Sequence, residues 1–187
     1  AQLREWFGAA KPKEVSQDLW TFLLPRIFDG LARGEEIANV GIQIVLRPFP
    51  TGAADRWRAD EWSVIDRFQR AFLNHHGERG DECLDDVLCM FALGGWSVDA
   101  LWAQVMAWPT EKIAARLYRD WFPNERHGKI WITAFWGDDD AKAAMMARYQ
   151  SEDLAQRLMA FGMDRSAPKA ARDKALDVAN VITENDY

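Results

Sequence analysis

Apolar residues recur every three or four positions along most of this 187-residue chain, a spacing that is typical of amphipathic helices. The first such stretch begins at Ser16, a good N-cap residue, and Gly34 ends it. Pro25 lies inside the stretch and cannot donate a backbone hydrogen bond. We therefore expect it to kink this helix or to divide it into two shorter ones.

Two helices are predicted in the middle of the chain. The first covers residues 60–76, with Gly77 and Gly80 as its stop signals. The second begins with Asp81 as its N-cap and ends at the glycine pair 94–95, which can take up positive φ. One face of each helix is apolar, so each is expected to be half exposed.

Shorter helical patterns follow, separated by serine, threonine, glycine or proline signals. They begin at Ser97, Thr110, Ile130, Asp138, Ser151 and Ser166. The one that starts at Ile130 is expected to end near Gly137. The connections between these patterns are short, which favours antiparallel neighbours.

The segment from Glu35 to Leu46 is harder to assign. Ile37, Val40 and Ile44 would share one face of a helix, but the run 42–46 is equally compatible with a short strand. Prolines and glycine then predict a loop that extends to about Arg58.

These patterns predict an all-α fold of about nine or ten antiparallel helices, arranged as an orthogonal bundle or as an irregular HEAT-like stack of helical hairpins. A chain of 187 residues is short enough for one core, so we expect a single domain over 1–187. Residues 1–15 and 184–187 are expected to be flexible ends. Ala, Leu and Met outnumber Val, Ile and Thr, which also favours helices.

Composition and charge exclude several classes of protein. Apolar residues make up 49% of the chain, so disorder is not expected. The net charge is −6 and both halves are negative, which argues against a nucleic-acid partner. Membrane insertion is not expected either, because no run approaches the roughly 20 apolar residues of a membrane span. We expect a cytoplasmic protein whose two cysteines are reduced.

Residues 75–89 contain the densest group of potential metal ligands. They are His75, His76, Asp81, Glu82, Cys83, Asp85, Asp86 and Cys89. Adjacent histidines on a helix point about 100° apart, and no familiar zinc-binding spacing occurs in the group. The sequence therefore favours a pair of histidines at a helix end and solvated acids over a metal site. Cys83 is interpreted as a packed thiol and not as a nucleophile.

The run Asp138-Asp139-Asp140 is interpreted as the cap and first turn of a helix, because acids are favourable there and the calcium-loop pattern is absent. Phosphate-binding loops and nucleophile elbows are also absent. We therefore predict no catalytic, cofactor-binding or metal-binding residue, and no cofactor.

Ten tryptophans are the unusual feature of the composition. One group coincides with apolar helix faces and is predicted to be core: Trp20, Trp62, Trp102, Trp121 and Trp131. The other group falls at helix ends or in loops: Trp6, Trp57, Trp96, Trp108 and Trp136. We favour the interpretation that the second group plugs the ends of the helical array over an exposed aromatic patch.

The segments Leu19-Trp20-Thr21-Phe22-Leu23-Leu24-Pro25-Arg26-Ile27 and Ala134-Phe135-Trp136-Gly137-Asp138-Asp139-Asp140, followed by Tyr149-Gln150-Ser151, resemble a loose group of uncharacterised bacterial all-helical proteins. The resemblance implies a helical fold over most of the chain. It implies no activity.

The sequence favours a non-enzymatic protein that interacts with a protein partner or with itself, as a scaffold does. The apolar residues at helix ends and the lack of a catalytic set motivate this expectation. The alternative is a protein that binds, or acts on, a small apolar or aromatic ligand between helices near Trp96, Trp102 and Trp108. A metal-dependent enzyme is a third possibility.

Overall fold

The computed structural model describes residues 15–39, 41–123, 128–137 and 139–184. Within these ranges the fold is all-α, as predicted, and no strand occurs. The α-helices are fewer than the nine or ten expected. They are α2 (Gln17–Ala32), α3 (Ala59–Arg79), α4 (Leu84–Leu93), α5 (Val98–Met106), α6 (Thr110–Trp121), α7 (Asp139–Tyr149), α8 (Glu152–Met163) and α9 (Lys169–Glu184). Two short 3₁₀ helices, η1 (Ile42–Ile44) and η2 (Ala54–Arg56), complete the set.

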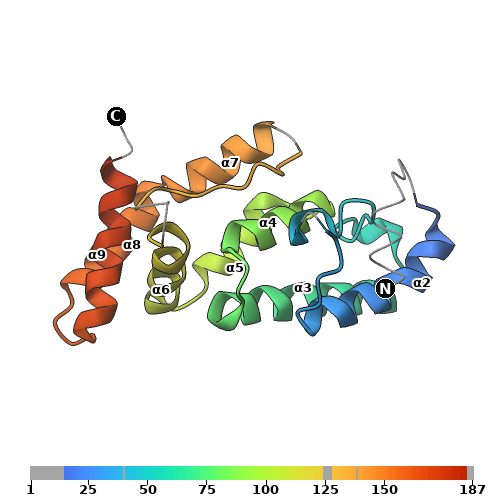
Figure 1. The fold of residues 1–187 in the computed structure, drawn as a ribbon, viewed down its shortest axis with the longest axis horizontal. Coiled ribbons are helices and arrows are strands. Elements are labelled where there is room, and N and C mark those ends of the chain that lie inside the picture. Colours follow the sequence, from blue (N-terminus) through green and yellow to red (C-terminus); the bar gives the residue numbers. More distant parts are fainter. Residues whose placement is uncertain (1–14, 40, 124–127, 138, 185–187) are drawn as a thin grey trace.

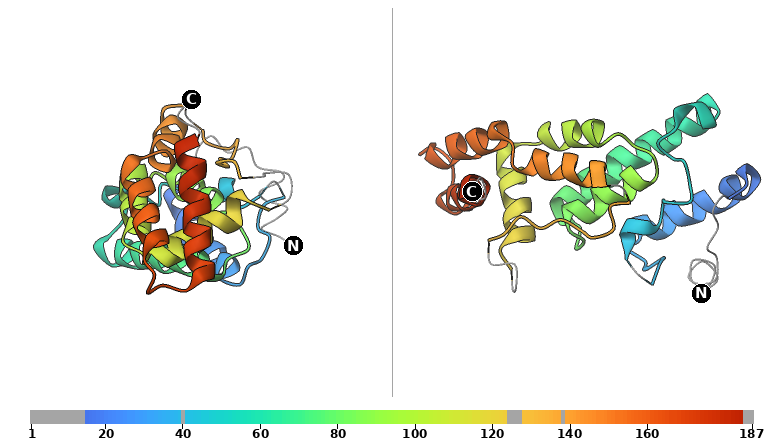
Figure 2. Two further views of the ribbon diagram at one scale, coloured as in Figure 1. Left: turned by 90° about the vertical axis from the view of Figure 1, so that its left-hand side faces the viewer. Right: turned by 90° about the horizontal axis from the view of Figure 1, so that it is seen from above.

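The helices form an elongated array (Figure 1). α2 lies at one end and α9, packed against α8, lies at the other, while α3 and α4 occupy the middle (Figures 1 and 2). α6 lies between the middle and the α8–α9 end and packs on α9. One connected cluster of buried apolar side chains extends from α2 to α9. No helix of the described ranges combines the length and apolarity needed to cross a membrane.

α4 is the central helix, and it differs most from the prediction. Its residues from Leu84 to Phe91 are all buried, because α3, α6 and η1 pack around it. Asp85 and Asp86 are only 2% and 6% exposed, so the expectation that they are solvated acids is wrong. A local pattern with one apolar face does not reveal a helix that is covered on every side.

The start of α4 also differs from the prediction. Asp81 was expected to cap it, but the helix begins at Leu84 and Cys83 occupies the N-cap position without a side-chain capping bond. The backbone N–H of Leu84 instead donates to Asp120 Oδ2 of α6, at 2.8 Å. A carboxylate from another helix therefore satisfies this free N–H group.

Gly77 does not end α3, which continues to Arg79. A Cβ atom at position 77 would overlap the indole ring of Trp108. This glycine therefore allows Trp108, at the junction of α5 and α6, to lie directly on the α3 backbone.

Two segments contain no α-helix in their described residues: residues 35–46, where the sequence pattern allowed a helix or a short strand, and residues 130–137, where it predicted a helix. In the described part of residues 35–46, only η1 is helical, and Gly41 before it has a φ of 112°, which lies in the region that favours glycine. Residues 128–137 form an irregular strap with no helix. The strap packs on α4, because Thr133 N and Trp136 Nε1 donate to Asp85 Oδ2 at 2.6 and 3.1 Å.

Other local predictions are confirmed. Ser97 and Ser151 cap α5 and α8, where their hydroxyls accept from Ala100 N at 3.5 Å and from Leu154 N at 3.4 Å. Asp139 and Asp140 lie in the first turn of α7, whereas Asp138 lies outside the described residues.

The chain ends and Pro25 can be compared with the prediction only in part. α2 continues through Pro25, so the proline does not divide the helix. Val15 is buried and α9 reaches Glu184, and the flexibility expected of the two ends stays a prediction. Residues 1–14 and 185–187 lie outside the described ranges.

Candidate functional site

The tryptophans do not form an exposed patch. Among the described residues none of them is exposed, and Trp6 lies outside the described ranges. Trp108 and Trp136 are buried, while Trp96 is half-buried and stacks on Trp62 with ring centroids 5.1 Å apart. These helix-end residues are therefore packed into the fold, and the interpretation that they plug the ends of the helical array stays a prediction.

The tryptophans predicted as core divide into two sets. Trp102 and Trp121 are buried, and both rings meet Tyr149 edge-on at 5.6 and 5.5 Å. Trp20, Trp62 and Trp131 are half-buried. The prediction is therefore confirmed in full for the first two alone.

The three tryptophans of the expected ligand site make different contacts. Trp102 packs on Tyr149, and Trp108 lies on α3, where its indole Nε1 donates to Asn74 Oδ1 at 2.7 Å. Trp96 stacks on Trp62, and its indole Nε1 is buried without a hydrogen-bond partner among the described residues. The ligand site near these residues stays a prediction.

The metal-ligand candidates of residues 75–89 do not come together. In the described ranges, no three His, Cys, Asp or Glu side chains are arranged to hold a metal ion. His76 stacks on Phe72, with 4.2 Å between the ring centroids. Burial raises the pKa of Cys89 to about 12, so its thiol is protonated at neutral pH and is a poor nucleophile.

Two basic residues of α6 donate hydrogen bonds to carbonyl groups at the C-terminal end of α3. Arg116 is completely buried, pairs with Asp120 Oδ2 at 2.9 Å, and donates to the carbonyl groups of His76, Gly80 and Glu82. One turn earlier, Lys112 Nζ donates to the carbonyl oxygen of Asn74 at 3.1 Å. Cations are favourable at a helix C-terminus, where carbonyl groups lack partners.

Arg119 lies further along the same face of α6, but its side chain contributes little to the packing of the fold. Its side chain is 42% exposed, and its Nε lies 3.9 Å from Asp120 Oδ1, beyond hydrogen-bonding distance. Lys174 of α9 has no acidic partner within the described residues, and its Nζ lies 5.7 Å from the centre of the Tyr118 ring. Lys174 and the partly exposed Arg119 are therefore the two cations of this surface that a ligand can reach.

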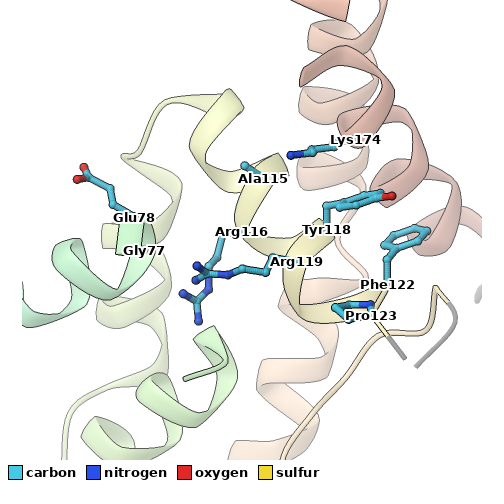
Figure 3. Close-up of a pocket in the computed structure, with 9 residues that line it drawn as sticks. All are labelled: Gly77, Glu78, Ala115, Arg116, Tyr118, Arg119, Phe122, Pro123 and Lys174. Atoms are coloured by element: carbon cyan, nitrogen blue, oxygen red, sulfur yellow. The ribbon is translucent and has the colours of Figure 1, made fainter. Parts of the chain in front are cut away.

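Arg119 and Lys174 lie on two sides of a groove with a volume of about 590 Å³. The outer face of α6 forms its floor, with the end of α3 on one side and α9 on the other (Figure 3). Tyr118 and Phe122 stack in parallel on the α9 side, with ring centroids 4.5 Å apart. We call this the α6 groove; it is lined by Gly77, Glu78, Ala115, Arg116, Tyr118, Arg119, Phe122, Pro123 and Lys174.

The α6 groove is basic although the chain is acidic. Glu78 is its one acidic lining residue, and Lys112 neutralises it with an Nζ–Oε1 distance of 3.3 Å. The buried pair of Arg116 and Asp120 is likewise neutral. Lys174 and the partly exposed Arg119, which Asp120 approaches only to 3.9 Å, thus place positive charge beside an aromatic surface, an arrangement suited to a carboxylate that carries an apolar group.

The sequence prediction missed the α6 groove. Tyr118 falls among the apolar positions of its helical pattern, and Lys174 belongs to a helix that is distant in the sequence. The available signal was the spacing of Lys112, Arg116 and Arg119, which forms a basic stripe along one helix.

Comparison with protein-family models, with curated proteins and with solved structures finds no match to this chain. The resemblance of residues 19–27 and 134–140 to uncharacterised bacterial proteins therefore stays a prediction. The geometry of the described residues is what supports a function.

Proposed function

We propose that this protein is a non-enzymatic interaction protein that binds an acidic segment of a partner protein in the α6 groove. One observation carries the proposal: Lys174, which has no acidic partner among the described residues, and the partly exposed Arg119, whose contact with Asp120 is as long as 3.9 Å, flank the Tyr118–Phe122 stack. The segment would carry carboxylates for the two cations and an aromatic or large apolar residue for the stacked rings.

Charge supports the choice of an acidic partner. The chain as a whole carries −6, so an acidic segment is repelled by most of the surface and attracted to the groove. Such complementarity selects a binding register and speeds association, and it weakens as salt screens the charges. A nucleic acid, which is a long polyanion, is a poor partner because it would extend beyond the groove onto acidic surface.

The shape of the fold is compatible with a scaffold. We favour the irregular HEAT-like stack over the orthogonal bundle, because α6, α8 and α9 pack against one another within an elongated array. In such stacks, outer helix faces provide extended binding surfaces. Free cysteines agree with a location in the cytoplasm.

A labelled peptide tests the proposal directly. The probe is a fluorescein-labelled peptide of alternating glutamate and phenylalanine, and binding is followed by fluorescence anisotropy at low and high salt. We expect the double variant Arg119→Glu/Lys174→Glu to bind at least about tenfold more weakly, because two attractive contacts become repulsive. Binding to the wild type should also weaken with salt.

The matched control is Arg165→Glu/Lys169→Glu, which makes the same charge change at two exposed residues, one between α8 and α9 and one at the first position of α9. It should bind the peptide within about twofold of the wild type. Equal losses in both variants would show a general charge effect and contradict the proposal. Absence of binding to the wild type would contradict it as well.

A further inference from the structure

The strap is joined to the other described residues by three hydrogen bonds. At its beginning, Gly128 N donates to the carbonyl oxygen of Trp121 at 3.0 Å. The other two donors, Thr133 N and Trp136 Nε1, both bond Asp85 Oδ2. One oxygen of a single carboxyl group therefore accepts two of the three hydrogen bonds.

The buried residues of the strap lie at the same place. Thr133 and Trp136 are 3% and 7% exposed, whereas the other described residues of the strap are half-buried or exposed. The part of the strap that is packed most deeply is therefore the part that bonds Asp85. Whatever changes this carboxyl group acts on the attachment of the whole strap.

The titratable groups that face Asp85 from α4 and α7 are acidic or neutral. The charge of Asp86, the next residue of α4, raises the pKa of Asp85, and the hydroxyl of Tyr149 of α7 lowers it. Burial raises the pKa of that hydroxyl well above its ordinary value, so it stays protonated. Cys89, one turn further along α4, is a protonated thiol because burial raises its pKa to about 12.

The other elements that pack on α4 do not supply a cation to Asp85. On the α6 side, Arg116 is paired with Asp120 at 2.9 Å. On the η1 side, the uncharged side chain of Gln43 donates to Asp86, and Arg47 is exposed. Within the described residues Asp85 thus forms no ion pair, and its ionisation leaves an uncompensated negative charge inside the fold.

The two oxygens of Asp85 have unequal surroundings. Because Oδ2 accepts two donors, the proton of the neutral acid belongs on Oδ1. Oδ1 is buried and has no hydrogen-bond partner among the described residues. When the proton leaves, a buried charged oxygen has neither a donor nor water, and this is costly. Release of the strap would open Oδ1 to water.

We propose that the strap is a latch that responds to pH: the neutral Asp85 side chain keeps it on α4, and the ionised side chain favours its release. With the strap closed, burial raises the pKa of Asp85 to about 7, whereas a hydrated aspartate has its ordinary pKa of 3.8. Between these two values the open form binds fewer protons than the closed form, so a rising pH shifts the equilibrium toward opening.

The size of the effect follows from this difference. Each pH unit between the two pKa values favours the open form by up to about tenfold. We therefore expect the equilibrium constant for strap opening to rise about 10- to 100-fold from pH 5 to pH 8. The latch uses α4 and the strap, and it does not depend on Arg119 or Lys174 of the α6 groove.

Hydrogen exchange measured by NMR tests the latch in the full chain. Exchange rates, corrected for base catalysis, give the opening constant at the Thr133 amide, which is bonded to Asp85, and at the Val178 amide in the buried face of α9. The Thr133 constant should rise about 10- to 100-fold from pH 5 to pH 8. It should also exceed the Val178 constant at each pH, because the strap opens without unfolding of α9.

Three variants complete the test. Asp85→Asn cannot ionise, so its Thr133 constant should stay within about twofold over the same range, whereas Asp177→Asn, at an exposed position, should keep the wild-type rise. Trp136→Phe keeps a ring and loses the indole donor, so it should raise the Thr133 constant about fivefold at pH 5 and still show the rise.

Three results would overturn the proposal. The first is a Thr133 constant that does not change with pH in the wild type. The second is exchange at Thr133 that is no faster than at Val178, which would show that the strap opens only when the whole protein unfolds. The third is a rise that persists in Asp85→Asn. If Asp85→Asn does not fold, the wild type and Trp136→Phe still decide the first two.

Discussion

Trp136 donates its indole N–H to Asp85 Oδ2 at 3.1 Å and so ties the strap of residues 128–137 to the central helix α4. Thr133 N donates to the same oxygen, at 2.6 Å, and the hydroxyl of Tyr149 also favours the charged form of Asp85. The other oxygen, Oδ1, is buried without a hydrogen-bond partner. Burial outweighs these donors and raises the pKa of Asp85 to about 7.

Asp85 should therefore make the stability of the protein depend on pH. Its ordinary pKa is 3.8, so between about pH 4 and pH 7 the unfolded chain loses this proton before the folded chain does. The stability that Asp85 contributes is present below pH 4 and is lost as the pH rises through 7. At about 1.4 kcal/mol per pKa unit, the loss is on the order of 4 kcal/mol.

Asp85→Asn removes this titration and keeps an oxygen acceptor for Thr133 N and Trp136 Nε1. We expect the variant to be more stable than the wild type at pH 8, with the difference shrinking toward pH 5. Urea unfolding at both values measures it. Asp177→Asn, at an exposed position of α9, should follow the wild-type profile, and an unchanged profile in Asp85→Asn would refute the assignment.

The buried pair of Arg116 and Asp120 should be a major contributor to stability. Arg116→Met removes the 2.9 Å ion-pair partner of the buried Asp120 and deprives three carbonyl groups of their donor. We expect a loss of about 3–5 kcal/mol in the free energy of unfolding. Arg119 lies three residues later and is partly exposed, so Arg119→Met should lower the free energy of unfolding by less than about 0.5 kcal/mol.

Denaturant unfolding of these two variants separates a structural arginine from a binding one. Arg119→Met should weaken the acidic peptide while it leaves the fold intact. If both variants lose the same stability, then Arg119 belongs to the same structural network and is not free to bind a partner.

The features that the sequence could predict are those that depend on contacts between residues close together in the chain. Ser97 and Ser151 bond the helices that follow them within three residues, so their caps were visible in the pattern. The Asp85–Thr133 bond joins residues 48 positions apart, and the Leu84–Asp120 bond joins residues 36 apart. No local pattern distinguishes a buried acid with such a partner from a solvated one.

The same limit explains the glycines and the candidate sites. A glycine in a helical pattern predicts the end of the helix, unless it is known that an aromatic side chain packs against that glycine. Trp108 packs on Gly77 from the junction of α5 and α6, so the stop signal was misread. Arg119 and Lys174 likewise meet only because α6 and α9 pack together.

Gly77→Ala should destabilise the protein although alanine is the better helix former. The added methyl group meets the Trp108 ring, and overpacking of this kind costs about 1–3 kcal/mol. Gly30→Ala in α2 is the comparison, because its nearest neighbour is the flexible end of Ile37, at 3.1 Å. We expect a much smaller change there, offset by the gain in helix propensity of about 1 kcal/mol.

Thermal unfolding ranks these two glycine variants. Tryptophan fluorescence should also shift in Gly77→Ala, because the Trp108 ring must move. A Gly77→Ala protein as stable as Gly30→Ala would contradict the close packing of α3 against Trp108.

The two cysteines should react at very different rates, which tests the complete burial of α4. Cys89 is fully buried in the middle of the helix, and burial raises the pKa of its thiol to about 12, whereas Cys83 is partly exposed at the N-cap. Because the thiolate is the reactive species, a disulfide reagent should modify Cys83 quickly and Cys89 only as fast as the protein opens. Cys83→Ser should remove the fast phase and Cys89→Ser should keep it. Fast reaction of Cys89 in the folded Cys83→Ser protein would show that α4 is accessible on one side, as the simple amphipathic pattern had suggested.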